Sequence, residues 1–257
     1  MNPVYFVGAG PGDPELLTLK GQRLLKQAEV IVYAGSLVNP ALLTGLKAEL
    51  HDSSRLELEA LVGLMIKAQR QNRRVVRLHT GDPSLFGAIR EQMDALEAAG
   101  VPWRLVPGVS SMAAAAAALG AELTLPEAAQ TVIVTRRAGR TPVPEGEGLA
   151  SLARHQATML IFLSVGMIEQ VVAELRAGGY PEDTPAAVVE KASWPEERCL
   201  RGTLADIAGK VREAGITKTA LIAVGRALAE AGPRAVSRLY SREFSHACRL
   251  GREADNG

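Results

Sequence analysis

Three short loops carry residues whose types and spacing could bind a small molecule. The first reads Gly-Ala-Gly-Pro-Gly-Asp-Pro at 8–14, the second Thr-Gly-Asp-Pro-Ser-Leu at 80–85, and the third Pro-Gly-Val-Ser-Ser at 107–111. Each loop follows a short apolar run that is typical of a buried β-strand. Ligands on open α/β sheets bind beyond the carboxyl ends of the strands. The three loops therefore predict a ligand site at one edge of a sheet.

The first loop departs from the dinucleotide-binding fingerprint. That motif needs a sixth-position glycine, where Asp13 stands, and an acidic residue about 20 residues on, whereas the second strand ends at Tyr33. Pro11 and Pro14 also lack the N–H groups that would bind a pyrophosphate. No Gly-Lys-Ser/Thr follows, which excludes a P-loop. A nicotinamide-dependent oxidoreductase is thus disfavoured, and by itself the loop also fits a tight strand-to-helix turn.

The second and third loops each allow a structural and a functional interpretation. Asp82 could bind a ribose or an amino group, or it could cap a helix predicted from 84 to 99. Ser110 and Ser111 begin a helix, where free N–H groups and hydroxyls suit a carboxylate or a ribose. Capping explains these serines equally well, and the two roles are compatible.

Strand and helix patterns alternate along the whole chain. In the first half, apolar runs predict strands at 4–7, 30–33, 74–78 and 103–106, with helices at 18–28, 56–71 and 85–99. In the second half, they predict a helix at 110–119, strands at 131–135, 158–163, 186–189 and 220–224, and helices at 168–177 and 204–214. We therefore expect two α/β domains, each a mainly parallel or mixed sheet flanked by helices, with the active cleft between them. The expected ranges are 1–108, 109–240 and a partly disordered tail at 241–257.

The bulk composition excludes several classes of protein. The 257 residues carry a net charge of +1 without a basic stripe, so we expect no nucleic-acid partner. Cys199 and Cys248 stand far apart and do not form a metal-ligand pattern. No apolar run reaches the length of a membrane span, and the N-terminus lacks a basic n-region. These features predict a cytoplasmic protein without a membrane partner.

Taken together, the three loops resemble the tetrapyrrole (corrin/porphyrin) methylase family. The resemblance continues at 162–166, 185–190 and 219–222, so it covers most of the chain. Stretches at 33–40, 122–127, 130–136, 139–142 and 191–195 resemble the branch that methylates carbon 11 of precorrin-4, a corrin precursor of cobalamin. By contrast, Gly-Ala-Ile-Arg-Glu at 87–91 differs from the Gly-Arg-Gly-Gly-Glu run of the uroporphyrinogen-III methylases.

The resemblance implies an S-adenosylmethionine-dependent C-methyltransferase that releases S-adenosylhomocysteine and needs no metal. It implies a small tetrapyrrole as substrate, either precorrin-4 or its cobalt form, and a homodimeric enzyme. Relatives have a methionine where this chain has Val165. The residues expected next to the methyl donor, mostly through backbone groups, are Pro11, Thr80, Gly81, Asp82, Leu85, Ser110, Ser111, Val165, Ala192 and Thr219.

The chemistry of such a reaction suggests further candidate residues. The sulfonium donor is a strong electrophile and the acceptor carbon is enamine-like, so alignment is the main task of the protein. If a proton must be removed, the candidate bases are Asp13, Asp82 and Glu190, which we leave unranked. The substrate's carboxylates would suit guanidinium groups. We expect substrate contacts from Arg136, Arg137, Arg140 and Tyr33, although a solvated charged loop would also explain the arginines.

The sequence also allows other interpretations of His79 and of the function. His79 ends an apolar strand and could be either structural or catalytic. A different branch of the family, acting on an RNA ribose or a modified protein histidine, would need a basic surface or a docking face for protein. A non-catalytic binding module would bind the donor without turnover.

Overall fold

The chain divides into two compact units. The computed structural model describes residues 2–229, 237, 239 and 241–250. The first unit comprises Met1–Leu119, Val189–Cys199 and Thr217–Leu221. The second comprises Gly120–Val188, Leu200–Ile216 and Ile222–Gly257. Two segments from late in the sequence thus belong to the unit that contains the three glycine loops.

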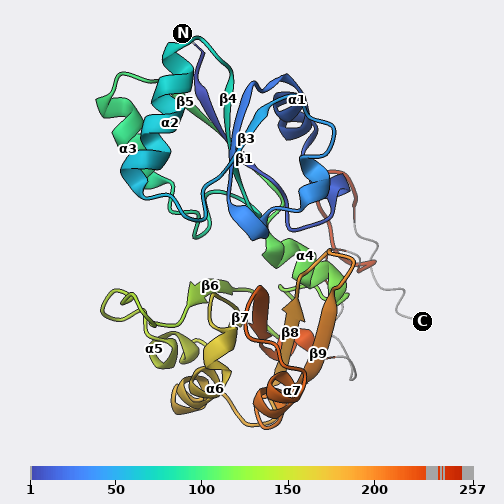
Figure 1. Ribbon diagram of the computed structural model, residues 1–257. Coiled ribbons are helices and arrows are strands. Elements are labelled where there is room, and N and C mark those ends of the chain that lie inside the picture. Colours follow the sequence, from blue (N-terminus) through green and yellow to red (C-terminus); the bar gives the residue numbers. More distant parts are fainter. Residues whose placement is uncertain (1, 230–236, 238, 240, 251–257) are drawn as a thin grey trace, which may run out of the picture. The chain divides into compact units, whose positions relative to one another are not determined.

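The first unit is built on a parallel sheet of five strands in the order β3-β2-β4-β1-β5 (Figure 1). The strands are β1 (Val4–Gly8), β2 (Val30–Tyr33), β3 (Glu49–Asp52), β4 (Val75–His79) and β5 (Trp103–Val106). In register, Gly8 of β1 lies opposite His79 of β4, and Val7 lies opposite Val106 of β5. The neighbouring strands β4, β1 and β5 therefore place the three loops side by side at the carboxyl edge of the sheet, where the strand order reverses.

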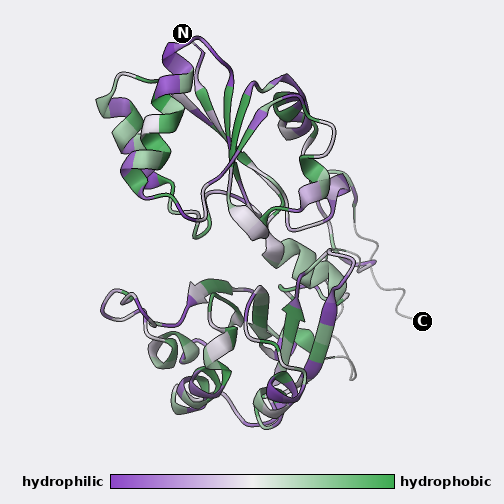
Figure 2. Ribbon diagram, viewed as in Figure 1, coloured by the Kyte–Doolittle hydropathy of each residue, from purple (hydrophilic) through white to green (hydrophobic). Residues whose placement is uncertain are grey.

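Helices cover both faces of this sheet. Helices α2 (Leu58–Arg70) and α3 (Arg90–Ala98) lie on one face, and α1 (Leu19–Gln27) lies on the other (Figure 1). Because successive strand residues point to opposite faces, Phe6 joins the core under α2 and α3, while Val7 joins the core under α1. Figure 2 shows the strands of this sheet largely in the hydrophobic colour, as burial on both faces requires. Helix α4 (Ser111–Ala118) follows the third loop.

The second sheet is mixed and has the strand order β6-β7-β10-β8-β9. Strand β7 pairs in parallel with β6 and antiparallel with β10. Helix α6 packs against both α5 and α7. The bounds are β6 (Val132–Arg136), β7 (Thr158–Phe162), β8 (Pro185–Glu190), β9 (Arg198–Thr203), β10 (Ala220–Val224), α5 (Leu149–Ala153), α6 (Ile168–Ala177) and α7 (Ile207–Glu213). The expected α/β fold with two mainly parallel or mixed sheets is confirmed.

The division of the chain differs from the expected ranges. The structure groups α4 with the first unit, so the division falls after Leu119 and not after Gly108. The reason is local, because a Cβ placed on Gly81 would lie 3.7 Å from the backbone nitrogen of Ser111. Within the predicted tail, residues 241–250 include an isolated bridge between His246 and Arg249. The remainder of that tail, 251–257, lies outside the described residues.

One predicted helix begins later than its pattern indicated. The helix predicted from 84 or 85 begins at Arg90, with Ile89 as its N-cap. Phe86 and Ala88 both have positive φ angles, 53° and 47°, which interrupt a right-handed helix. Of the two interpretations of Asp82, the one in which it caps this helix is therefore wrong.

The periodic patterns also missed two strands, β3 and β9. Both lie at sheet edges, and their exposed positions are mostly polar. Edge strands commonly carry polar residues, so an apolar run gives no signal for them.

The core on the α2–α3 face gives a direct test of the packing. Leu96→Ala is expected to lower the free energy of unfolding by about 2–5 kcal/mol, because a fully buried side chain would be replaced by a cavity. Leu19→Ala is the matched control, since Leu19 is 86% exposed, and its effect should stay within about 0.5 kcal/mol. Urea denaturation followed by circular dichroism measures both, and equal losses would contradict this core.

Candidate functional site

The first two loops are joined by a pair of backbone hydrogen bonds between glycines. The N–H of Gly81 donates to the carbonyl of Gly10 at 2.7 Å, and the N–H of Gly10 donates to the carbonyl of Gly81 at 3.3 Å. Gly10 and Gly81 have φ angles of 78° and 60°, a region that is strained for residues with a Cβ. The N–H of Ala9 also donates to the carbonyl of His79 at 2.7 Å. The two loops are therefore fixed to each other by backbone bonds.

The third loop approaches the same point. A Cβ on Gly108 would lie 2.2 Å from the carbonyl oxygen of Gly81 and 2.8 Å from the Cα of Gly8. A Cβ on Gly8 would likewise lie 2.6 Å from the Cα of Gly108. Real Cβ contacts are not that short, so these residues must be glycines. We call Gly8, Gly10, Gly81 and Gly108 the glycine crossing.

Asp82 connects the second and third loops. One carboxylate oxygen accepts the N–H of Gly108 at 2.8 Å, and the other accepts the N–H and hydroxyl of Ser84 at 2.9 and 2.5 Å. Partial burial opposes ionisation, but the bonds from Ser84 and Gly108 outweigh it and lower the pKa of Asp82 below its ordinary value. Asp82 is thus an ionised acceptor that fixes the loops, and a weak proton acceptor.

The start of α4 forms the wall next to Gly81. Ser110 is the N-cap of α4, and its hydroxyl accepts the N–H of Met112 at 3.3 Å, which confirms the capping interpretation. The position of a Gly81 Cβ lies 3.7–3.8 Å from Ser111 N and Ser110 Cα, an ordinary contact distance. Thr80 is exposed and Leu85 is partly buried. The structure therefore brings Gly81, Asp82, Ser110 and Ser111 together, as predicted from the loops.

Residues 189–199 also hold the first loop through hydrogen bonds. The indole Nε1 of Trp194 donates to the carbonyl of Pro11 at 2.8 Å, and the hydroxyl of Ser193 accepts the N–H of Asp13 at 3.0 Å. Ala192 is 6% exposed, and the N–H of neighbouring Lys191 donates to the carbonyl of Thr219 at 2.8 Å. Pro11, Ala192 and Thr219 thus belong to one unit, and the Pro11 carbonyl already has a donor.

The other two candidate bases also hold neighbouring groups. Asp13 accepts the N–H of Glu15 at 2.8 Å and caps the 3₁₀ turn Pro14–Leu16. Glu190 accepts from the guanidinium of Arg198 at 2.6 Å, with 14% of the Glu190 side chain exposed. Each carboxylate therefore has a structural partner.

Tyr33, a candidate for substrate contact, packs partly buried against the α1 side of the core.

The remaining candidates lie in the second unit. Arg136 donates to the carbonyls of Thr141 and Pro142 at 3.2 and 2.6 Å. Arg137 forms an ion pair with Glu174 at 2.7 Å, whereas Arg140 is exposed. Val165 is buried at the start of the 3₁₀ turn Val165–Met167. Arg136 therefore stabilises its own loop, and Arg137 links that loop to α6. Of the three arginines, Arg140 is the most exposed.

His79 is a buried structural residue. Its ring stacks on Phe6 with centroids 6.0 Å apart, and only 4% of the residue is exposed. Burial, with a smaller effect from nearby Arg77, lowers the pKa of His79 to about 3. The ring is thus neutral at physiological pH, and its Nε2 is a buried atom without a hydrogen-bond partner in the described structure. This favours the structural interpretation over the catalytic one.

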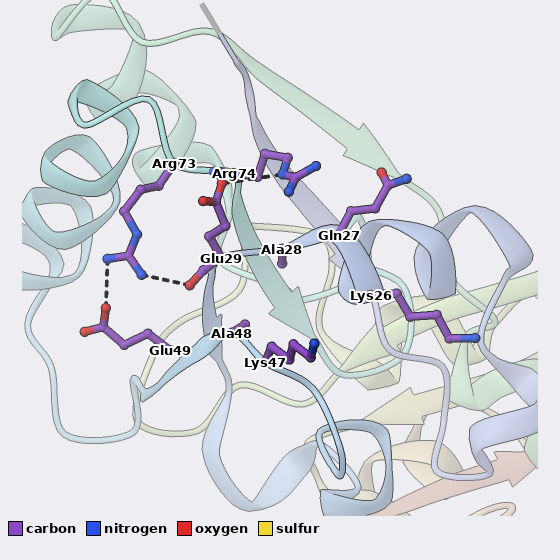
Figure 3. Close-up of a pocket in the computed structure, with 9 residues that line it drawn as sticks. All are labelled: Lys26, Gln27, Ala28, Glu29, Lys47, Ala48, Glu49, Arg73 and Arg74. Carbon is purple, nitrogen blue, oxygen red and sulfur yellow. Dashed lines mark hydrogen bonds and ion pairs between the residues drawn. The ribbon is translucent and has the colours of Figure 1, made fainter.

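A pocket of about 550 Å³ lies at the opposite edge of the first sheet, where β2, β3 and β4 begin (Figure 3). Arg73 donates to the Glu49 carboxylate at 2.8 Å and to the Glu29 carbonyl at 2.9 Å, as the dashed lines in Figure 3 mark. The Glu29 carboxylate accepts the backbone N–H of Arg74 at 2.9 Å. The glutamates and arginines of this pocket are therefore paired with one another, and the glycine crossing lies at the other ends of the strands.

Two further findings concern the described residues only. Within residues 2–229 and the described part of the tail, no group of three or more His, Cys, Asp or Glu side chains is arranged to hold a metal ion. In the same residues, no helix combines the length and apolar character that crossing a bilayer requires.

Comparison with protein families gives a match over most of the chain. The model for tetrapyrrole (corrin/porphyrin) methylases matches residues 3–208. A cobalt-precorrin-4 C(11)-methyltransferase of Methanocaldococcus jannaschii is 56% identical, over 95% of this chain and 94% of that protein. A precorrin-4 C(11)-methyltransferase of Pseudomonas aeruginosa is 52% identical, over 96% of this chain and 99% of that protein.

Solved structures give a consistent result. The X-ray structure of a cobalt precorrin-4 methyltransferase, a cobalamin biosynthetic enzyme, has a TM-score of 0.86 and 48% identity, covering 88% of this chain and 96% of that one. A uroporphyrin-III C-methyltransferase from Thermus thermophilus, complexed with S-adenosylhomocysteine, has a TM-score of 0.74 and 35% identity, covering 88% and 99%.

The glycine crossing gives the first test of the site. Gly108→Ala is expected to lower the free energy of unfolding by about 1–3 kcal/mol, because the new Cβ would overlap the backbone of Gly81 and Gly8. The matched control is Gly63→Ala in α2, where a Cβ meets no atom within 4 Å, and which should raise stability by about 0.5–1 kcal/mol. Urea denaturation measures both, and an unchanged Gly108→Ala protein would contradict the crossing.

Asp82 gives a test by pH. Its folded pKa lies below the ordinary value of 3.8, so its contribution to stability is present above that value and is lost as the pH falls through the folded pKa. Asp82→Asn should therefore be less stable than the parent by a constant amount above about pH 5, and the gap should shrink below about pH 4. Denaturation across this range measures the gap, and a gap that widens on acidification would contradict the assignment.

Proposed function

The chain belongs to the tetrapyrrole (corrin/porphyrin) methylase family, and we propose that it transfers a methyl group from S-adenosylmethionine to carbon 11 of precorrin-4 or cobalt-precorrin-4. The proposal rests on two relatives named for that activity, which are 56% and 52% identical to this chain over nearly its full length. The glycine crossing supports it, because the crossing draws together the loops that carry the predicted donor contacts.

The residues of the site fit a donor that is bound mostly through backbone groups. A Cβ on Gly81 would stand in ordinary contact with Ser110 and Ser111, so the glycine leaves open space beside the first turn of α4. The residues proposed to hold the donor are Pro11, Thr80, Gly81, Asp82, Leu85, Ser110, Ser111, Val165, Ala192 and Thr219. When bound, S-adenosylmethionine supplies a methyl group on a positively charged sulfur. The task of the chain is then to orient the reactants and exclude water, which can lower the activation barrier by roughly 7–11 kcal/mol.

Proton transfer is a secondary element of this proposal. Asp13, Asp82 and Glu190 each accept hydrogen bonds from neighbouring groups of the protein. The hydrogen bonds from Ser84 and Gly108 lower the pKa of Asp82, so this carboxylate is a weaker base than a free one. The proposal therefore assigns these three residues to holding the loops, and it relies on positioning for rate enhancement.

Substrate contacts are proposed for Tyr33 and for the arginines after β6. Arg140 is the first choice for a carboxylate of the tetrapyrrole, because it is exposed while Arg136 bonds carbonyls of its own loop and Arg137 pairs with Glu174. The relatives act on forms with and without cobalt, so both acceptors belong to the proposal. A homodimeric state and a cytoplasmic location stay predictions.

The proposed activity is tested with S-adenosylmethionine carrying a ¹³C methyl group. We expect the label at carbon 11 of precorrin-4 or cobalt-precorrin-4, with uroporphyrinogen III as the control acceptor that stays unlabelled. Calorimetry should also give micromolar binding of S-adenosylhomocysteine and none of NAD. Methylation of uroporphyrinogen III alone would assign the chain to another branch of the family. Binding of NAD without binding of either sulfur compound would overturn the proposal.

A further inference from the structure

The ring of Trp194 lies directly on Gly12 in the first loop. A Cβ on Gly12 would lie 2.1 Å from Cδ1 of Trp194, 2.2 Å from Nε1 and 2.7 Å from Cγ, and these are its three nearest atoms. The φ angle of Gly12 is not among the positive ones, so its backbone conformation is open to other residues. The glycine at position 12 therefore serves to admit the indole ring.

Side chains from two distant segments hold three successive residues of this loop. Trp194 donates to the carbonyl of Pro11, Asn39 donates to the carbonyl of Gly12 at 2.8 Å, and Ser193 accepts the N–H of Asp13. Pro11 and Gly12 are buried. Buried backbone groups require partners, so these three bonds determine which way the peptide units of the loop face.

The segment that carries Trp194 is itself tightly fixed. The N–H of Trp194 donates to the carbonyl of Lys191 at 2.9 Å, and the N–H of Ser193 donates to the carboxylate of Glu197 at 2.6 Å. Lys191 and Ser193 have φ angles of 48° and 67°, which non-glycine residues rarely adopt. Such strain persists only where the surroundings enforce it, and it concentrates at functional sites.

We propose that Trp194 is a positioning residue that holds Pro11–Asp13 in the donor-binding conformation. It acts through the Pro11 carbonyl and through the contact of its ring with Gly12. The inference rests on the proposed function, since Pro11 is one of the predicted donor contacts. Donor affinity would then depend on Trp194, which lies 183 residues from Pro11 in the sequence.

A mutant cycle on Trp194 and Gly12 tests this role, with S-adenosylhomocysteine as the probe and calorimetry as the measurement. Trp194→Phe keeps a ring but loses one hydrogen bond, so the Kd should rise about fivefold. Trp194→Ala should raise it by about tenfold to a hundredfold, the range expected when a binding group is misplaced. Gly12→Ala should have a similar effect in the parent, and less than about twofold in the Trp194→Ala background, where the overlapping ring is gone.

The second tryptophan provides a matched control and a spectroscopic readout. Trp103 donates its Nε1 to Glu97 at 3.0 Å in the same unit, away from the first loop. Trp103→Phe should leave the Kd unchanged, and it makes Trp194 the sole tryptophan of the chain. In that variant, S-adenosylhomocysteine should change the indole emission with the Kd found by calorimetry, a response that a remote structural residue would not give.

The outcomes separate this inference from the proposed function. If the parent binds no S-adenosylhomocysteine, the proposed function fails. If the parent binds it but Trp194→Phe binds equally well and the emission of Trp194 is unchanged, the positioning role is wrong and the function stands. Fully additive effects of Gly12→Ala and Trp194→Ala would also overturn the role. Trp194→Phe and the emission test keep the inference decidable even if Trp194→Ala does not fold.

Discussion

The close approach of three backbone segments at Gly8, Gly81 and Gly108 is the constraint on which the rest of the site depends. The strand order places β4, β1 and β5 side by side, so the loops that follow them emerge at one edge. A Cβ on Gly8 or Gly108 would lie too close to neighbouring backbone atoms, which cannot move aside as the end of a flexible side chain can. Contact between the loops in turn lets one carboxylate, Asp82, bond Gly108 while it fixes its own turn.

Most of the charged residues that were candidates for the site hold loops in place. Asp82, Asp13 and Glu190 each accept a hydrogen bond from a defined partner. Arg136 bonds carbonyls of its own loop, and Arg137 pairs with the carboxylate of Glu174 in α6. Such a site is suited to a reaction whose donor is already reactive, because orientation then matters more than acid–base chemistry. The pKa of Asp82, lowered by its hydrogen bonds, agrees with this division of roles.

The sequence predicted the parts of the fold that depend on local pattern. The bounds of β2, β5, β10 and α6 were predicted as observed. For β2, β10 and α6 the reason is that buried strands and amphipathic helices carry a clear apolar signal. Edge strands β3 and β9 lack that signal. Positive φ angles at Phe86 and Ala88 delay the start of α3, and no residue type there indicates them. The contact of Trp194 with Gly12 joins residues far apart in the chain, so it follows from tertiary packing alone.

The proposed donor site comprises the three glycine loops and residues 189–199. Amide hydrogen exchange with and without S-adenosylhomocysteine tests it most directly, because protection reports the opening of individual segments. We expect slower exchange at 8–14, 80–88, 107–112 and 189–199 when the ligand is present, with little change around the pocket lined by Lys26, Lys47 and Arg73. Protection confined to that pocket, or none in the four segments at saturating ligand, would contradict it.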